Sequence, residues 1–434
     1  MGSPYRCDPN VPIYGLMAQI THDDCALYPV NARFIRQSSA LCGLLLAVPA
    51  LRVAFEESLP AADTPGTYQY VVPDKVNDGW ETASLASENL NADLIKDLFE
   101  RISDGTYKNI TSVLVVKSGK LVVEEYFPRQ EVLGERRGRV LKRVSPQQLY
   151  SATKSVTSIL IGLAIEKHLI RGVDEKISTF FPEYADIFAH DGKDRLCLKD
   201  FLTMSAGLSW DEWEYPYADA RNDALKALLS PDPIRYLLER PLVAAPGVHF
   251  TYNTGISVAL GQIIYKVSGL RADKFAERYL FEPLGISDYY WAKLPDDIVE
   301  TGGGLFLRPR DMAKVGYLFL NGGRWKGRQI ISDEWIKAST RNHAGSVQFP
   351  AWLQAANGYG YQWWLGALNV GIRDVTFYGA RGRGGQFILV FPDQQIVAVF
   401  TGLNDNILMN QPLEMLQRYI LPAALPQPAN TEPK

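Results

Sequence analysis

The chain has 434 residues, 47% of them hydrophobic and 21% charged, which is the composition of a globular protein able to bury a full core. A formal net charge of -3 at pH 7 leaves no basic excess to neutralise phosphates, which disfavours nucleic acid as a partner and favours a small-molecule substrate. Three of the four cysteines lie in the first tenth of the chain and the histidines are scattered, so we expect neither a disulfide framework nor a metal or other cofactor.

Residues 1–53 are predicted to be a leader. Arg33 and Arg36 precede an apolar run, Ala40 to Leu51, which is shorter than the roughly 20 residues that span a bilayer and so predicts no stable membrane anchor. The run ends in Val48-Pro49-Ala50, as in a secretory signal peptide with a cleavage site, and Met1 to about Pro29 would then be an upstream extension. We expect export to the periplasm or the medium; the alternative is a buried helix at the head of a cytoplasmic protein.

A Pro-, Thr- and Gly-rich stretch without apolar period predicts a linker over residues 54–82, and the folded domain is expected over residues 83–425. Its first apolar residues recur at helical spacing from Leu90 to Ile102. Asn109 to Phe127 then alternates around Lys117-Ser118-Gly119-Lys120, which predicts a strand, a turn and a second strand.

Helical patterns dominate from about Ser151 to Ile336, and strand patterns return after Gly358. The expected strands are Tyr359 to Leu365, Val375 to Tyr378, Gln386 to Phe391 and Gln395 to Thr401. A closing helix is expected over Pro412 to Ile420, and residues 426–434 are expected to be a disordered tail. This order predicts an α+β fold, in which one antiparallel sheet is flanked by terminal helices and carries a mostly helical inserted lobe at about 155–340.

Ser151 and Lys154 are the first candidates for chemistry. They begin an apolar helix, Val156 to Ile165, that is expected to be buried, and their spacing places both side chains on one helix face. Burial disfavours the charged form of a lysine, so a neutral amine could take the serine proton. The alternative is a serine helix cap beside an incidental lysine, but the chain has no G-x-S-x-G elbow and no histidine in a triad context.

Tyr252 is the second candidate, because a phenol held near an ammonium group can give and take a proton. The third is the segment Tyr378 to Gln386, whose glycine and alanine residues allow close approach of a ligand to the backbone. Its N–H groups, together with that of Ser151, could form an oxyanion hole. A phosphate-binding loop is the rival interpretation, but such loops lead into a helix and this one leads into a strand.

These segments together resemble the serine β-lactamase and penicillin-binding-protein superfamily, in particular its class C-like branch of esterases and 6-aminohexanoate-dimer hydrolases. Ser151 to Lys154 is similar to the family's S-x-x-K, and Tyr252 to Thr254, with Gly261 nine residues after the tyrosine, is similar to its Y-x-N. The resemblance covers roughly Leu90 to Ile420. Two further segments look like that branch: Gly302 to Leu307 and Tyr359 to Trp364.

The resemblance implies site residues and also shows departures. Thr254 stands where penicillin-active members carry asparagine, and the strand Phe377-Tyr378-Gly379-Ala380 has no K-T-G lysine to receive a β-lactam carboxylate. Ala380 would supply the second oxyanion N–H. The implied substrate-binding residues, of which the aromatic ones could instead belong to the core, are Trp210, Asp211, Tyr215, Thr254 and Arg381.

The sequence therefore predicts a serine hydrolase that cleaves a small ester or amide, with Ser151 as nucleophile and Lys154 and Tyr252 as general base and acid. One alternative is a β-lactamase or D-amino-acid peptidase acting on cell-wall-like amides. Another is a non-catalytic, penicillin-binding-like module that senses a ligand. The sequence gives no natural substrate and no oligomeric state.

Overall fold

The computed structural model describes residues 68–127, 145–345, 349–351, 353–404 and 409–425. These residues belong to one compact unit, which begins at Tyr68. The predicted leader at residues 1–53 and the predicted disordered tail at residues 426–434 lie outside the described residues, as do residues 54–67 of the predicted linker. No helix within the described ranges is both long and apolar enough to cross a bilayer.

Residues 68–82 are part of the folded unit, so the linker prediction is wrong for this segment. Tyr68 and Tyr70 pack against the hydrophobic core. Trp80 is buried, and its indole N–H donates to the carbonyl of Arg310 at 3.2 Å. The segment shows no apolar period because each of these aromatic residues packs separately on the folded unit. They do not form one buried face of a helix or strand.

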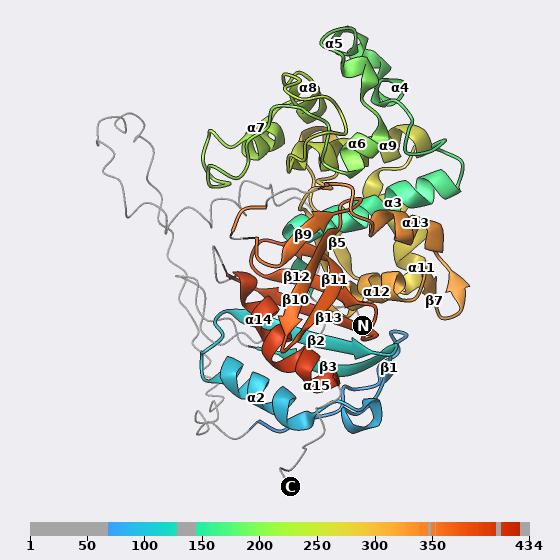
Figure 1. Cartoon of the computed structure of the whole chain (residues 1–434). Helices are drawn as coiled ribbons and strands as arrows, with labels where there is room; N and C mark the ends of the chain where they lie inside the picture. Colours follow the sequence, from blue (N-terminus) through green and yellow to red (C-terminus); the bar gives the residue numbers. More distant parts are fainter. Residues whose placement is uncertain (1–67, 128–144, 346–348, 352, 405–408, 426–434) are drawn as a thin grey trace, which may run out of the picture. The chain divides into compact units, whose positions relative to one another are not determined.

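Eight strands form the central sheet, in the order β1-β3-β2-β13-β12-β11-β10-β9 (Figure 1). They are β1 (Glu81–Thr82), β2 (Ile110–Lys117), β3 (Lys120–Tyr126), β9 (Ala356–Tyr359), β10 (Trp364–Val370), β11 (Arg373–Gly382), β12 (Gln386–Phe391) and β13 (Ile396–Gly402). Every neighbouring pair is antiparallel except β1 and β3, which confirms the predicted antiparallel sheet. Two smaller sheets contain β4 (Gln147–Gln148), β5 (Tyr289–Trp291) and β6 (Leu305–Leu307), and β7 (Arg324–Trp325) and β8 (Arg328–Gln329).

The predicted strand Tyr359 to Leu365 is wrong in its boundaries, because β9 ends at Tyr359 and β10 begins only at Trp364. Gln362, in the turn between them, has a φ of 61° and is 1% exposed. Its Oε1 accepts from the hydroxyl of Ser257 at 2.7 Å, and its Nε2 donates to the carbonyl of Phe201 at 3.1 Å. This turn therefore ties the sheet to α6 (Leu198–Leu202) and α9 (Thr254–Ser268).

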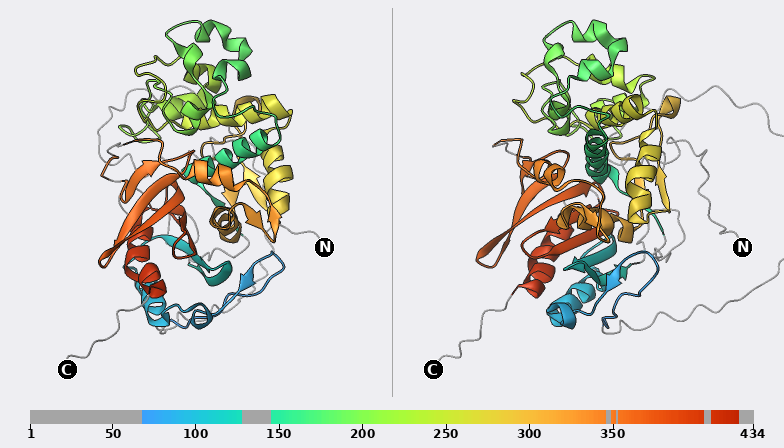
Figure 2. Two further views of the ribbon diagram at one scale, coloured as in Figure 1. Left: turned by 45° about the vertical axis from the view of Figure 1, so that its right-hand side comes forward. Right: turned by 90° about the vertical axis from the view of Figure 1, so that its right-hand side faces the viewer.

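Helices cover both faces of the sheet (Figure 2). On one face, α2 (Ala92–Ser103) packs with α14 (Gln411–Met415), the π-helical turn Leu416–Ile420 and α15 (Leu421–Ala424), which confirms the predicted flanking terminal helices. On the other face, α12 (Pro309–Leu320) packs on β2, β12 and β13, and a Cβ at its Gly316 would lie 2.5 Å from the side chain of Val397. The lobe predicted at 155–340 therefore includes one helix, α12, that belongs to the sheet layer.

The helical lobe is built on α3 (Thr153–Glu166) and α9, which pack against each other. A Cβ at Gly261 of α9 would lie 2.3 Å from Oγ1 of Thr301, so a glycine is needed there for this segment to approach the helix. The other helices of this region are α4 (Ile177–Phe180), α5 (Ala185–Phe188), α6, α7 (Asp223–Leu229), α8 (Pro233–Leu238), α10 (Ala272–Ala276), α11 (Glu282–Leu284) and α13 (Asp333–Ser339).

A buried ion pair joins α12 to β3 and to the segment before β1. The guanidinium of Arg310 donates to both carboxylate oxygens of Glu124, at 2.7 and 2.6 Å, and to Asp78 at 2.8 Å. We expect Arg310→Met to lower the free energy of unfolding by about 3 kcal/mol or more, because it leaves the Glu124 charge buried and unpaired. Urea unfolding followed by circular dichroism measures this; a double variant that also carries Glu124→Leu should recover much of the loss.

Candidate active site

Ser151 lies in a single-turn 3-10 helix (η3, Tyr150–Ala152) directly before α3. Tyr150 has a φ of 46°, a left-handed conformation that bulky residues rarely adopt, and it turns the chain immediately before Ser151. Every α3 residue from Thr153 to Ala164 is buried, as the apolar pattern predicts. Ser151 itself is partly exposed at the start of this helix, where backbone N–H groups favour developing negative charge.

Lys154 is buried in the first turn of α3, with 2% of its surface exposed. Its Nζ donates to Oγ of Ser151 at 3.1 Å and to the carbonyl of Gly302 at 2.7 Å. Burial lowers the pKa of Lys154 below the ordinary lysine value, and the carboxylates of Glu212 and Glu300 partly oppose that shift. A group in this state can release its proton and act as a base toward the serine hydroxyl.

Tyr252, just before α9, is 6% exposed and lies beside both residues. The Nζ of Lys154 is 5.0 Å from its ring centroid, and its hydroxyl interacts with the side chain of Ser151. The rings of Trp213 and Trp364 stack on it, with centroid distances of 5.3 and 5.7 Å. Burial, with the charge of Glu212, raises the pKa of Tyr252 well above the ordinary value, so the phenol holds its proton and can act as a donor.

The edge of β11 reaches the Ser151 turn. The register of β10 on β11 ends at the pair Trp364 and Gly379, so from Ala380 onward this edge has no strand partner among the described residues. A Cβ at Gly382 would lie 2.1 Å from the carbonyl oxygen of Leu149 and 3.1 Å from the nitrogen of Ala152, so backbone packs directly on backbone here. An open strand edge next to the serine turn is the arrangement that an oxyanion hole requires.

Glu212, which the sequence motifs do not single out, connects most of the neighbouring groups. Its carboxylate is 3% exposed and accepts from the backbone N–H and the hydroxyl of Thr254, at 2.7 and 2.9 Å. It also accepts from the indole N–H of Trp210 at 2.7 Å and from the hydroxyl of Tyr217 at 2.9 Å. It therefore holds the first turn of α9, and with it Tyr252, against the loop that follows α6.

The predicted substrate-binding residues mostly have other contacts. Thr254 and Trp210 donate to Glu212, as described above. The carboxylate of Asp211 accepts from the backbone N–H groups of Trp213 and Glu214, and the ring of Tyr215 lies 4.0 Å from the guanidinium carbon of Arg221. These four side chains shape the loop beside the site, and their contact with a substrate stays a prediction.

Arg381 lies next to Ala380 on β11, but its side chain is buried. The guanidinium donates to the carbonyl of Gln354 and to the side chain of Asn410, both at 2.9 Å. Burial lowers its pKa to about 9. A substrate carboxylate would have to compete with these two partners, so a binding role for Arg381 also stays a prediction.

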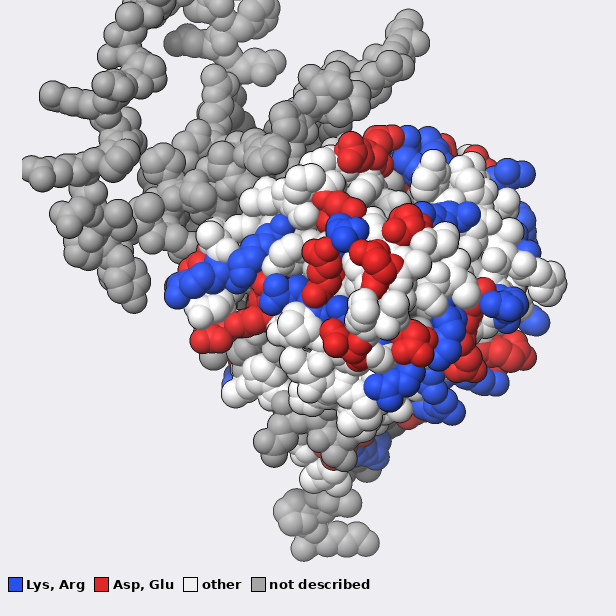
Figure 3. All heavy atoms as spheres, turned by 90° about the horizontal axis from the view of Figure 1, so that it is seen from above, with Lys and Arg blue, Asp and Glu red and all other residues white. Residues whose placement is uncertain are grey.

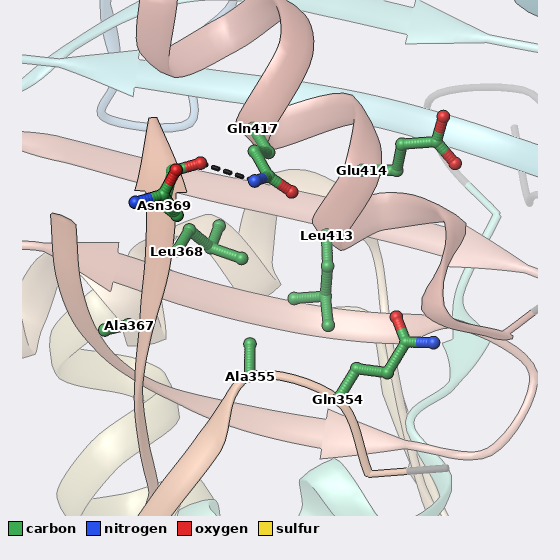
Figure 4. Close-up of a pocket in the computed structure, with 8 residues that line it drawn as sticks. All are labelled: Gln354, Ala355, Ala367, Leu368, Asn369, Leu413, Glu414 and Gln417. Carbon is green, nitrogen blue, oxygen red and sulfur yellow. Dashed lines mark hydrogen bonds between the residues drawn. The ribbon is translucent and has the colours of Figure 1, made fainter. Parts of the chain in front are cut away.

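A hollow of about 310 Å³ lies between β10 and the C-terminal helices (Figure 4). Its lining includes Leu368, Leu413 and Gln417, and the side-chain amide of Gln417 donates to the carbonyl of Asn369 across it. None of Ser151, Lys154 and Tyr252 lines it, so this hollow is separate from the candidate site.

The face seen in Figure 3, over the helices at the top of Figure 1, has acidic and basic side chains interspersed. On these helices Arg235 of α8 pairs with Asp186 of α5 at 3.3 Å and with Glu239 at 2.7 Å. Paired charges of this kind leave no extended basic surface on this face for a polyanion.

Two relatives are named for chemistry on acyl groups. Lovastatin esterase of Penicillium rubens is 26% identical over 204 residues, which are 41% of this chain and 49% of that protein. ML-236A carboxylate methylbutanoyltransferase of Penicillium citrinum is 26% identical over 156 residues, which are 33% of this chain and 37% of that protein. The chain thus spans about half or less of the length of these two relatives.

The fold has close counterparts among solved structures. A penicillin-binding protein homologue from Caulobacter crescentus superposes with a TM-score of 0.59 at 17% identity, covering 77% of this chain and 97% of that one. The family model described as Beta-lactamase matches residues 95–402, which include Ser151, Lys154, Tyr252 and Ala380. With that match over more than half of its length, the chain belongs to the beta-lactamase family.

Proposed function

We propose that this chain is a serine hydrolase that cleaves an ester or amide bond of a small molecule through an acyl-enzyme on Ser151. The observation that carries the proposal is the contact between Lys154 Nζ and Ser151 Oγ at 3.1 Å, with the amine buried and its pKa lowered. Family membership and the two relatives named for acyl chemistry support it.

In the first half-reaction, Lys154 takes the proton of Ser151 as Oγ bonds to the substrate carbonyl carbon. The carbonyl oxygen becomes an oxyanion, which the backbone N–H groups of Ser151 and Ala380 stabilise. Collapse of this intermediate breaks the bond to the alcohol or amine, which receives a proton from the hydroxyl of Tyr252, and Lys154 returns its proton to Tyr252. Ser151 is left acylated and the base is neutral again.

In the second half-reaction, water gives a proton to the same Lys154 and Tyr252 pair and its oxygen attacks the acyl carbon. The bond to Ser151 Oγ breaks, the serine regains its proton, and a carboxylic acid leaves. We further infer that the enzyme is exported, since its predicted leader has the layout of a secretory signal peptide.

A β-lactamase or D-amino-acid peptidase is the nearest alternative. Against it stands β11, whose residues Phe377-Tyr378-Gly379-Ala380 offer no lysine to a β-lactam carboxylate. A non-catalytic ligand sensor is the other alternative, and against it stands the assembled Ser151, Lys154 and Tyr252 group.

The test combines labelling with turnover. We expect a fluorophosphonate to add one label, located by mass spectrometry on the peptide that contains Ser151, and to abolish hydrolysis of short nitrophenyl esters. A penicillin should give no such adduct, and a chromogenic cephalosporin no turnover. Penicillin labelling of Ser151 would favour the β-lactamase or peptidase alternative. Failure of the native chain to react with the fluorophosphonate would favour the sensor.

A further inference from the structure

Glu300 is a buried carboxylate that touches the backbone behind Lys154. It is 8% exposed, and its Oε1 accepts from the backbone N–H of Gly302 at 2.9 Å. A Cβ at Gly302 would lie 2.9 Å from Oε1, and one at Gly303 would lie 3.2 Å from Oε2. The carboxylate therefore packs closely on these two glycines, and its hydrogen bond anchors the N–H of Gly302.

Gly302 is also the residue that holds the candidate base. While the N–H of Gly302 donates to Glu300, the carbonyl of Gly302 accepts from Lys154 Nζ at 2.7 Å. The same Nζ donates to Ser151 Oγ at 3.1 Å. Glu300 thus reaches the serine through one glycine residue and one amine, without touching the serine itself.

The charges around Lys154 come from several elements. Glu300 and Glu212 both act on it as negative charges, one beside Gly302 and one beside the start of α9. Tyr252 presents its ring to Lys154, and Arg381 acts in turn on Tyr252. Burial raises the pKa of Glu300, while the Lys154 ammonium and the N–H groups of Gly302 and Gly303 oppose that rise.

We propose that Glu300 is a positioning residue for the base. It orients Lys154 through the backbone of Gly302, and its buried negative charge stabilises the ammonium form of Lys154. The inference rests on the proposed function, because it gives Lys154 the role of base. Glu212 contributes charge as well, but four hydrogen-bond donors already occupy its carboxylate, so its contacts position α9 and not the amine.

The two parts of this role can be separated by substitution. Glu300→Gln keeps an oxygen for the Gly302 N–H but removes the charge, which destabilises the protonated form of Lys154. The neutral base should then persist at lower pH, so the acidic limb of the kcat/KM profile should move down by roughly 1 pH unit. Glu300→Ala also removes the oxygen that accepts from the Gly302 N–H. Its kcat/KM at the plateau should therefore be lower than that of Glu300→Gln by a factor of about 10 or more.

The measurement is the pH profile of nitrophenyl ester hydrolysis, together with the rate of fluorophosphonate labelling of Ser151 across the same pH range. Glu334→Gln, at an exposed position of α13, is the matched control, since it removes one surface charge and should leave the pH profile unchanged. Thermal unfolding of each variant checks that the fold is intact.

The proposal would be overturned if the acidic limb of the kcat/KM profile of Glu300→Gln stays within about 0.2 pH unit of the wild-type limb. That result is the one expected of a residue with a purely structural role. Equal plateau values of kcat/KM in Glu300→Ala and Glu300→Gln would overturn the inference that Glu300 orients Lys154. If the wild-type chain itself shows neither labelling nor turnover, the proposed function fails first, so the two failures are distinguishable.

Discussion

Replacing Ser151 with alanine is expected to lower kcat/KM for ester hydrolysis by about 10,000-fold or more and to abolish fluorophosphonate labelling. The hydroxyl is the group that bonds to the substrate, and the water that could replace it would have no fixed position. The remaining rate would come from the oxyanion donors alone. Steady-state kinetics on a nitrophenyl ester, with active-site titration of the wild type, measures the loss.

Ser155 provides the control for this result. It lies one turn along the same helix and is buried, but its hydroxyl donates to the carbonyl of Gln362 at 2.6 Å and does not face Lys154. Ser155→Ala should therefore lower the free energy of unfolding by about 1 kcal/mol and reduce kcat/KM by only a few-fold. Full turnover in Ser151→Ala, or an equal loss in both variants, would contradict the assignment of Ser151 as nucleophile.

Lys154→Met should lower kcat/KM by about 1,000-fold, because Ser151 then has no base within hydrogen-bond reach except a phenol that holds its proton firmly. Its effect on stability should have the opposite sign. A buried ammonium is costly, and methionine fills the same space without a charge, so Tm should stay equal or rise.

The stability gain of Lys154→Met should depend on pH. The pKa of Lys154 is lowered in the folded protein, so between that pKa and the ordinary lysine value the unfolded chain binds a proton that the folded protein releases. The wild type therefore gains stability as pH rises through this window, and the Met variant lacks that contribution. The advantage of the variant should shrink as pH increases, as urea unfolding at several pH values can measure.

The kinetics of the same variant test the assignment of the base. If Lys154→Met retains more than about a tenth of the wild-type kcat/KM, the base would instead be assigned to Tyr252.

The sequence predicts those helices and strands whose apolar residues repeat because one face of the element is buried. The repeat from Leu90 to Ile102 becomes α2 because one face of that helix is buried against the sheet, and the alternation from Asn109 to Phe127 becomes the hairpin of β2 and β3. It fails at Tyr359 to Leu365, where a buried turn is as aromatic as the strands beside it. It also fails for α12, because an apolar face does not reveal whether it packs on a sheet or on helices.

The candidate site is predicted where its groups lie close in the chain. Lys154 follows Ser151 by three positions where η3 runs directly into α3, so their contact follows from helical geometry. Glu212 and Glu300 have no such signal, since each acts on a residue distant in sequence, Thr254 in one case and Lys154 in the other. The glycine run from Gly302 to Gly304 was the available clue, because closely spaced glycines indicate that something approaches the backbone.

The contact of Gly382 with Leu149 has a consequence for how this enzyme can diversify. With no room for a methyl group between them, the strand that would hold the oxyanion and the turn that carries the nucleophile must shift together or not at all. Selection for a new substrate should then act on side chains outside this contact, such as Trp213 and Trp364, which stack on Tyr252. Substrate range should therefore evolve through the aromatic side chains around the site, because a side chain at Gly382 would push the serine turn away from the strand edge.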